Sequence, residues 1–523
     1  MYDKETGTIW LGKSGDKKVC IYPRMANRHG MICGATGTGK TITLKVLAES
    51  FSDMGVPVFL ADVKGDLAGF CVPGKDSEDM QNRIKRFGLD EAGFTYDSYP
   101  ANFWDLYKEK GMPLRTTVSE MGPLLLSRIL DINDTQTDVL SIVFKLADDN
   151  DMLLIDTKDL KAMLTYVAEH NKEYASQYGN IAKASVNAII RAIVALEGEG
   201  ADQFFGEPAL SISDWFLQNS GKGTIQVLDC QKLIHHPNMY ATFLLWMLSE
   251  LFETLPEVGD PEKPKMVFFF DEAHMLFDSA PKALMNKIEQ VVKLVRSKGV
   301  GVYFVTQNPR DIPDPILAQL GNKIEHALHA YTPSEQKSAK AAAMSFRENP
   351  EFDTYDTLLS LGTGEALVSV LDEKGVPTVV EKTSILPPQS LMGAIDDRTR
   401  EDEIKSGMLF SRYNDYFDRD SAYEFLQRNQ TLTEGETPAE AVTAAAPAES
   451  ASDKKKKEKV DKTSMSYKTQ RAAQNVAKTA SGTVGREVGK TVGGAIGGRF
   501  GKTLGGNIGS SIGRNFLGVF FKS

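Results

Sequence analysis

Short apolar runs and longer stretches with a helical period alternate along much of the chain. Runs that are continuously apolar, or apolar at every second position, and that are bounded by turn residues predict β-strands. These runs lie at 30–34, 57–62, 225–229, 266–271, 300–306, 324–329 and 366–370. Apolar residues recur at helical spacing at 40–54, 238–254, 281–297 and 333–344. This alternation predicts an α/β fold in which helices cover a mainly parallel sheet.

One long segment departs from the alternation. Residues 116–200 carry apolar side chains at helical spacing, such as Leu124, Ile129 and Val143, without convincing strands. We therefore predict a helical insertion between two parts of one core. The predicted organisation is a first core part at 1–115, the insertion at 116–215, a second core part at 216–395, a helical extension at 396–430, a linker at 431–465 and a basic glycine-repeat tail at 466–523.

The composition changes at about residue 430. Thr, Glu, Pro and Ala dominate 431–452, and such a segment is too poor in large apolar residues to build a core. Glycine then occupies every fourth position from 485 to 513, each time after an apolar residue. Each glycine costs a helix about 1 kcal/mol relative to alanine, so we expect a largely unstructured tail. Self-association of helices, docking to a protein partner and contact with an anionic membrane surface are the alternatives.

Charge is spread unevenly along the chain. The whole chain has a net charge of −10, although residues 451–523 carry 15 Lys or Arg against 4 Asp or Glu. The acidic body argues against a broad nucleic-acid-binding face but is compatible with a local basic lining. Neither a signal peptide nor a membrane-spanning run is present, and the cysteines lack metal-site or disulfide spacing. We expect a cytoplasmic protein with reduced thiols.

Residues 34–41 match the P-loop pattern G-x-x-x-x-G-K-[ST]. They are Gly34, Ala35, Thr36, Gly37, Thr38, Gly39, Lys40 and Thr41. In this pattern the glycines let backbone N–H groups surround phosphate, the lysine reaches the β- and γ-phosphates, and the hydroxyl ligates Mg²⁺. A short apolar run precedes the loop and a helical stretch follows it. The sequence therefore predicts a site for ATP and Mg²⁺ rather than an ordinary glycine turn.

A second group of candidate residues follows the apolar run at 266–270. It ends in Asp271 and Glu272, as a Walker B strand does, so Asp271 would hold Mg²⁺ and Glu272 would polarise the attacking water. The alternative is a strand that ends in solvated carboxylates. His274 could contact phosphate or a neighbour, although we interpret it as structural.

Two further polar residues have open roles. Gln307 ends the apolar run at 300–306, so it is either a sensor of the γ-phosphate or a plain polar strand terminus. Arg296 closes the preceding helical stretch, where it is either a charge that stabilises the helix C-terminus or an arginine finger offered to a neighbouring subunit.

These residues carry a family resemblance. The motifs are Asn-Arg-His-Gly at 27–30, Asp-Val-Lys-Gly-Asp at 62–66, Asp-Glu-Ala-His at 271–274, Arg-Ser-Lys-Gly at 296–299 and Thr-Gln-Asn-Pro at 306–309. Together they resemble the HerA-like ATPases of the HerA/FtsK group over about 1–430. The resemblance implies a RecA-like core with an additional strand between the Walker strands, for which 225–229 is the candidate. It also implies hexameric rings and DNA translocation.

The same resemblance suggests roles for three polar residues. Arg28 would be an in-chain arginine near the phosphates, Arg296 the finger offered to a neighbour and Gln307 the polar sensor. HerA proper carries an N-terminal β-barrel, whereas only 33 residues precede Gly34 here. We therefore expect no docking to a HerA-type nuclease.

The leading interpretation is a Mg²⁺-dependent, ring-forming ATPase motor that acts on DNA. The alternative is an ATP-driven switch or assembly ATPase that its tail docks to a protein or membrane partner. A small-molecule kinase is disfavoured because the sequence has no acceptor-site motif. No helix-turn-helix, zinc finger or aromatic–basic ribbon is readable, so the DNA interpretation depends on the resemblance.

Overall fold

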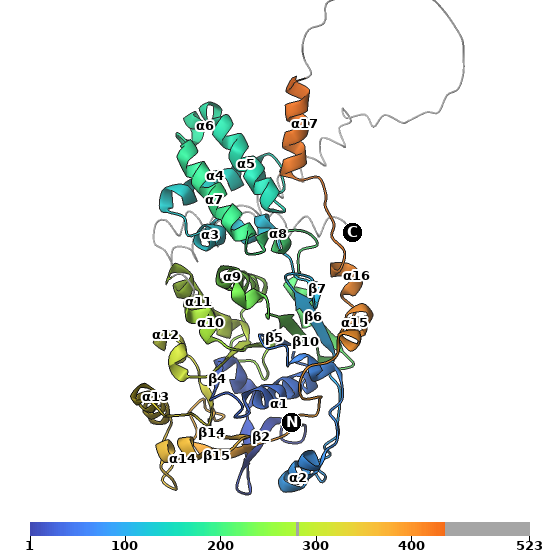
Figure 1. Cartoon of the computed structure of the whole chain (residues 1–523), viewed down its shortest axis with the longest axis vertical. Coiled ribbons are helices and arrows are strands. Elements are labelled where there is room, and N and C mark those ends of the chain that lie inside the picture. The colour runs from blue at the N-terminus through green and yellow to red at the C-terminus, as the bar shows by residue number, and fades with distance from the viewer. Residues whose placement is uncertain (279–281, 435–523) are drawn as a thin grey trace, which may run out of the picture. The chain divides into compact units, whose positions relative to one another are not determined.

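A mixed β-sheet forms the centre of the part of the chain that the computed structural model describes, residues 1–278 and 282–434 (Figure 1). The chain divides into two units, Met1–Thr437 and Pro438–Ser523, and all described residues belong to the first. The tail, and the linker beyond residue 434, lie outside the described residues.

The middle of the sheet is parallel. Its strands, in hydrogen-bonded order, are β13 (Asn322–His326), β4 (Gly30–Cys33), β12 (Val300–Thr306), β11 (Met266–Phe270), β5 (Val58–Asp62), β10 (Ile225–Asp229) and β6 (Ala101–Asp105). Their carboxyl ends lie along one edge, so the loops that follow β4, β5, β11 and β12 meet there. The predicted α/β fold is confirmed.

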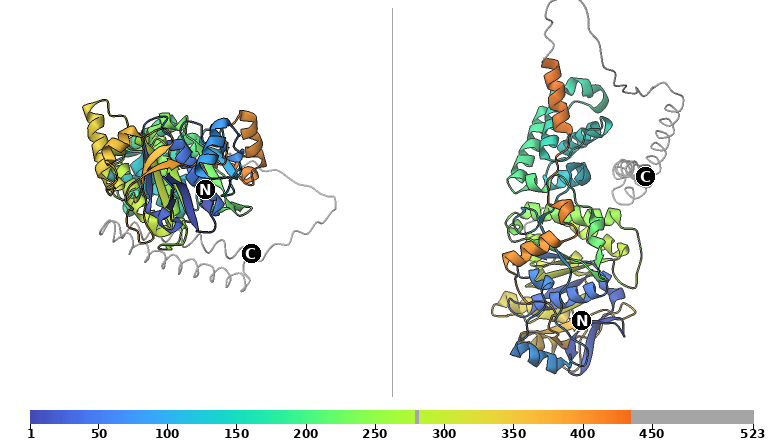
Figure 2. Two further views of the ribbon diagram at one scale, coloured as in Figure 1. Left: turned by 90° about the horizontal axis from the view of Figure 1, so that it is seen from below. Right: turned by 90° about the vertical axis from the view of Figure 1, so that its right-hand side faces the viewer.

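Helices cover both faces of the parallel strands. Along β11, Phe268 and Phe270 belong to one hydrophobic core, whereas Val267 and Phe269 belong to the core on the opposite face. This alternation explains why the strand sequences are continuously apolar. Helix α1 (Lys40–Asp53) lies across one face, as the right-hand view of Figure 2 shows. On the other face lie α9 (Pro237–Thr254) and α11 (Lys282–Val295), which pack on each other.

The expected position of one strand is wrong. Residues 225–229 do form β10, but this strand lies between β5 and β6, outside the two Walker strands. The strand that lies between β4 and β11 is β12, which follows them in sequence. Periodicity indicates that a strand forms but not which strands it pairs with.

An antiparallel extension, mostly absent from the sequence expectations, widens the sheet beyond β13. It consists of β14 (Glu365–Ser369), β15 (Glu381–Ile385), β2 (Thr8–Ser14), β3 (Lys17–Ile21) and the two-residue strand β1 (Tyr2–Asp3). The hairpin of β2 and β3 turns at Gly15, which has a φ of 57° and therefore suits glycine.

Helices fill the segment between β7 (Met112–Pro113) and β10. They are α3 (Val118–Ile129), α4 (Asp134–Asp149), α5 (Thr157–Glu169), α6 (Asn171–Tyr178), α7 (Lys183–Glu197) and α8 (Ala201–Phe204). Figure 1 shows them gathered above α9, and α3 packs directly on α9. The capping boxes at Thr117, Asn133 and Asp156 explain why α3, α4 and α5 begin where they do.

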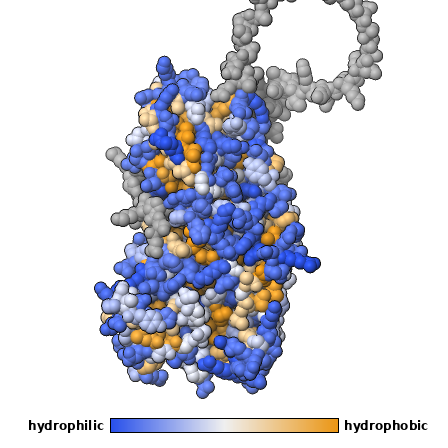
Figure 3. Space-filling view, in the orientation of Figure 1, coloured by the Kyte–Doolittle hydropathy of each residue, from blue (hydrophilic) through white to orange (hydrophobic). Residues whose placement is uncertain are grey.

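After β15 the chain runs back to these helices. It forms α15 (Asp397–Ser406), α16 (Phe410–Tyr413) and α17 (Ala422–Glu434), of which α17 packs on α5. Among the described helices, none combines the length and apolar character that a membrane span requires. The face shown in Figure 3 is mainly hydrophilic, with separate hydrophobic patches.

Candidate nucleotide site

The loop between β4 and α1 has a backbone that requires glycine. Gly34, Gly37 and Gly39 have φ values of 146°, 80° and 116°, in the region that side chains disfavour. At Gly34 an added Cβ would lie 2.5 Å from the Cβ of His326, so this position also lacks space. The loop leads directly into the N-terminus of α1, where unpaired N–H groups and the helix dipole favour a bound phosphate.

The side chain of Lys40 binds the backbone of this loop. Its Nζ donates hydrogen bonds to the carbonyl oxygens of Gly34 at 2.6 Å and Ala35 at 3.0 Å. The side chain is buried, and burial lowers the pKa of its ammonium group although Glu272 opposes the shift. Among the described residues, the hydrogen-bond acceptors of Lys40 are neutral carbonyls, and a buried ammonium group held in this way is well suited to bind an incoming phosphate.

A buried histidine packs against the P-loop. His326, at the end of β13, makes a 2.8 Å hydrogen bond between its Nε2 and the Oγ1 of Thr43 in α1. Burial lowers the pKa of His326 to about 4, so the imidazole stays neutral beside Lys40 at physiological pH. The neutral ring therefore does not repel the lysine that binds phosphate.

Asp271 follows β11 and is suited to bind a cation. Its carboxylate is only 5% exposed, and its Oδ2 has no hydrogen-bond partner among the described residues. Burial raises the pKa of Asp271 to about 6 despite the nearby charge of Lys64. A divalent cation would supply the missing partner, and Thr41, the second residue of α1, is the hydroxyl that the P-loop pattern offers to the same ion.

Glu272 lies at the centre of a polar cluster. Its carboxylate is 2.5 Å from Lys64 Nζ and 3.3 Å from His274 Nδ1, and it accepts a 3.1 Å hydrogen bond from Gln307 Nε2. Burial raises the pKa of Glu272, but the hydrogen bonds from Lys64 and Gln307 outweigh burial and leave the pKa below its usual value. Because β12 pairs with β11, Gln307 lies beside the Walker B carboxylates, as a sensor must.

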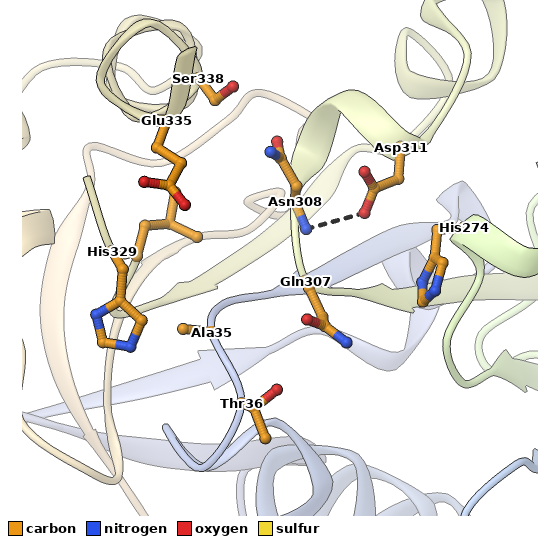
Figure 4. A pocket seen from close by; sticks show the side chains of 10 residues that line it. Ala35, Thr36, His274, Gln307, Asn308, Asp311, His329, Glu335 and Ser338 are labelled. Atoms are coloured by element: carbon orange, nitrogen blue, oxygen red, sulfur yellow. Dashed lines mark hydrogen bonds between the residues drawn. The ribbon is translucent and has the colours of Figure 1, made fainter. Parts of the chain in front are cut away.

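A cavity of about 480 Å³ opens beside these groups (Figure 4). The P-loop residues Ala35 and Thr36 form part of its wall, and Gln307 and His274 point into it from the opposite side. The backbone N–H of Asn308 donates a 3.1 Å hydrogen bond to Asp311, which fixes the chain after β12. The cavity is thus shared by the P-loop, the Walker B region and the sensor strand.

The two candidate arginines lie at the opposite end of the strands. Arg28 precedes β4 and Arg296 precedes β12, whereas the P-loop follows β4. The guanidinium groups converge on Asp260, with nitrogen–oxygen distances of 2.9 Å from Arg28 and 3.7 Å from Arg296. A four-residue strand spans about 13 Å, so Arg28 is not near its own P-loop, and that expectation is wrong.

Buried His29, next to Arg28, binds the two elements that flank Arg296. Its Nε2 donates to the carbonyl oxygen of Val292 in α11, and its Nδ1 accepts from the backbone N–H of Val302 in β12, both at 3.0 Å. Burial lowers the pKa of His29 to about 4, so the ring remains neutral and keeps both bonds. The ring therefore couples the helix before Arg296 to the strand after it.

Sequence reasoning did not assign a role to Lys64 or Asp260. Lys64 stands in a motif that the family resemblance identified, two residues after β5, and that position could have indicated the site. Asp260 lies in a polar segment between α9 and β11, and no local pattern marks it. Its partners lie 232 and 36 residues away in sequence, so only the fold brings them together.

The chain is similar in sequence to known proteins. A family model described as "Helicase HerA-like C-terminal" matches residues 9–508. The chain is 22% identical over 383 residues to the DNA double-strand break repair helicase HerA of Sulfolobus acidocaldarius, covering 71% of this chain and 67% of that protein. It is 22% identical over 368 residues to HerA of Sulfurisphaera tokodaii, covering 69% and 66%. The chain therefore spans about two thirds of the length of these relatives.

Solved structures with a related arrangement include the bacterial conjugative coupling protein TrwB. The unbound form of TrwB matches with a TM-score of 0.48 and 14% identity, covering 74% of this chain and 91% of that chain.

Proposed function

This chain belongs to the helicase HerA-like C-terminal family and is a P-loop ATPase, and from that premise we propose that it is a motor that acts on DNA as a ring of identical subunits. The observation that carries the proposal is the separation of its polar groups. The phosphate-binding loop and Glu272 lie at the carboxyl edge of the sheet, whereas Arg28 and Arg296 lie at the amino edge. The arginines can act on a nucleotide only if a second copy supplies it.

Each residue at the carboxyl edge of the sheet would have a separate role in hydrolysis. The P-loop backbone and Lys40 bind the β- and γ-phosphates, and Asp271 and Thr41 hold Mg²⁺, which neutralises charge on the phosphates when it is bound. Glu272 orients and polarises the attacking water, and Gln307 holds the Glu272 carboxylate in place. Removing Glu272 should therefore lower the rate more than the affinity.

The proposal that DNA is the substrate rests on the family. The two relatives are named as DNA double-strand break repair helicases. The body of this chain is acidic, so contact with DNA requires a local basic surface such as the lining of a ring. Hexameric assembly is the form that the family resemblance implies.

The proposal is tested by ATP hydrolysis with and without DNA, together with mass measurement by light scattering. We expect DNA to raise the rate, less so as salt increases, since phosphate contacts release counterions. We also expect a mass several times that of one chain. Neither binding nor stimulation at low salt would contradict a DNA motor and favour the ATP-driven switch.

The basic tail requires its own control. Residues 451–523 carry 15 Lys or Arg against 4 Asp or Glu, so they can tether DNA without any motor action. A chain that ends at residue 450 should keep DNA-stimulated hydrolysis if DNA passes through the ATPase body. Loss of binding at unchanged basal hydrolysis would identify the tail as an electrostatic tether.

A further inference from the structure

Lys64 forms an ion pair with the residue assigned to activate water. Its Nζ lies 2.5 Å from Glu272 Oε1, and Glu272 is almost fully buried, with 5% of its side chain exposed. The same carboxylate accepts a hydrogen bond from Gln307 through its other oxygen. In this arrangement the carboxylate that would polarise water is paired with an ammonium group.

The chain holds Lys64 in place by its backbone and leaves its side chain accessible. The Asp62 carboxylate accepts hydrogen bonds from the N–H groups of Gly65 at 2.7 Å and Leu67 at 3.1 Å. Gly65 has a φ of 75°, which lets the chain turn directly after Lys64. The Lys64 side chain is 40% exposed. The turn is therefore rigid, whereas the ammonium group can change partner by side-chain rotation alone.

The charges around the P-loop favour such a change of partner. Lys64 is close enough to Lys40 for its charge to oppose protonation of Lys40, although burial is the larger cause of the lowered Lys40 pKa. Two ammonium groups therefore lie close enough to influence each other beside the P-loop. A γ-phosphate carries more negative charge than one carboxylate, so it is the stronger partner for an exposed ammonium group.

We propose that Lys64 binds the γ-phosphate of ATP and that, on doing so, it releases Glu272 to polarise the attacking water. Bound ATP thereby frees the carboxylate that its hydrolysis requires. ADP has no γ-phosphate and leaves the ion pair between Lys64 and Glu272 intact. This inference rests on the proposed ATPase function and adds a second phosphate-binding lysine to it.

The decisive measurement is binding rather than turnover. Lys64→Met keeps the aliphatic stem and removes the charge, and its affinity for Mg²⁺–ADP and for a non-hydrolysable ATP analogue with Mg²⁺ is compared with that of the unaltered chain. A charge-assisted contact to phosphate predicts about tenfold or greater weakening for the triphosphate analogue. The affinity for ADP should change less than about twofold, because ADP lacks the phosphate that Lys64 contacts.

Lys293→Met is the matched control. Lys293 also pairs with a glutamate, Glu289, but on the partly exposed surface of α11 far from the P-loop in sequence. It should bind both nucleotides as the unaltered chain does. Equal weakening of ADP and analogue by Lys64→Met, or no weakening of either, overturns the inference. If the unaltered chain bound neither nucleotide, the proposed ATPase function itself would fail.

A double-mutant cycle tests the exchange of partners. In the unaltered background, Glu272→Gln should tighten binding of the analogue severalfold, because the ion pair no longer competes with the γ-phosphate. In the Lys64→Met background, the same change should have a smaller effect, since no ion pair exists to be broken. Identical effects of Glu272→Gln in both backgrounds overturn the proposed exchange even if Lys64 contacts phosphate.

Discussion

Adjacent carboxylates at the end of β11 have opposite pKa shifts. Burial raises the pKa of Asp271 to about 6, whereas hydrogen bonds from Lys64 and Gln307 outweigh burial and lower the pKa of Glu272. Neighbouring carboxylates with different environments can take different roles in one reaction. The unpartnered oxygen of Asp271 suits a cation, and the anchored Glu272 suits orientation of water.

The first prediction separates binding from turnover at these residues. Lys40→Ala should abolish tight nucleotide binding, because it removes the buried ammonium group that faces the phosphates. Glu272→Gln should bind ATP yet hydrolyse it at least about 100-fold more slowly, since it loses the group that polarises water. Fluorescent-nucleotide titration and steady-state hydrolysis measure the two effects. Turnover of Glu272→Gln equal to that of the unaltered chain would contradict the assignment of Glu272.

The second prediction concerns Glu325 in β13, whose carboxyl is completely buried beside Cys33 of the neighbouring strand β4. Neither oxygen has a hydrogen-bond partner among the described residues, and burial raises its pKa from 4.5 to about 8. Between these values the folded chain holds a proton that the unfolded chain has released. The free energy of unfolding should therefore fall as pH rises from 4.5 to about 8, by up to about 1.4 kcal/mol per pH unit.

Glu325→Gln removes this titration. We expect its stability to fall less steeply with pH in this window and to exceed that of the unaltered chain at pH 8. Denaturant unfolding at several pH values measures the slope. Glu289→Gln, a change at a partly exposed carboxylate, serves as a control and should keep the original slope. The same slope in both variants would show that Glu325 does not carry the effect.

At the scale of elements, the P-loop depends on β13 as well as on its own strand and helix. His326 supports the loop from β13, and Ala35 N–H donates to the carbonyl oxygen of Ala327 at 2.8 Å. The parallel pairing of β13 with β4 brings these residues under the loop. The close approach to His326 is what makes Gly34 different from the other loop glycines.

The third prediction uses that difference. Gly34→Ala should destabilise the fold by at least about 2 kcal/mol, because the added methyl group meets His326 and the residue must keep a φ of 146°. Gly37→Ala should cost about 1 kcal/mol, since nothing lies within 4 Å of its added methyl group. Thermal unfolding of the two variants compares the costs. Equal destabilisation would contradict the role of His326.

The sequence was most informative about elements whose pattern is local. The P-loop, the Walker B strand and the sensor strand are each defined by a few consecutive residues, and periodicity located six of the seven central parallel strands but missed β6. Pairing is not local, so the sequence misplaced 225–229 relative to the Walker strands. The hairpin of β2 and β3 was missed, although the turn at Gly15 is a recognisable signal.

The site shows the same division between local and non-local information. The sequence identified the P-loop, Asp271, Glu272 and Gln307 as candidates because each stands in or beside a recognisable motif. It could not identify the partner of Arg28, since Asp260 is 232 residues away and lies in a segment without regular structure. Long-range ion pairs depend on the fold and leave no spacing pattern in the chain.

At the scale of the whole molecule, the two ends of the parallel strands carry complementary chemistry. The carboxyl edge carries a phosphate-binding loop and two carboxylates, and the amino edge carries two arginines that share one carboxylate. Identical subunits that repeat a head-to-tail contact bring unlike edges together, and such contacts close into rings. In the proposed motor a complete site would therefore need two copies, which gives a physical reason for assembly.

The last prediction tests shared sites directly. Arg296→Ala should keep nucleotide binding but lose most turnover, because a finger stabilises charge that develops in the transition state. Glu272→Gln should also be nearly inactive. When the two variants are mixed and allowed to exchange subunits, some interfaces combine an intact Glu272 with an intact Arg296, and these should regain part of the original activity.

Matched controls make the mixing experiment decisive. Arg412→Ala removes an arginine that pairs with Asp214 rather than with Asp260, and it should retain full turnover alone. A mixture of Arg296→Ala with the double variant Arg296→Ala/Glu272→Gln should stay inactive, because no subunit offers the arginine. If the site is shared between neighbouring subunits, activity in the mixture of Arg296→Ala with Glu272→Gln should also rise with the fraction of mixed interfaces. Full activity of Arg296→Ala as a monomer, by light scattering and hydrolysis together, would refute a site completed by a second copy.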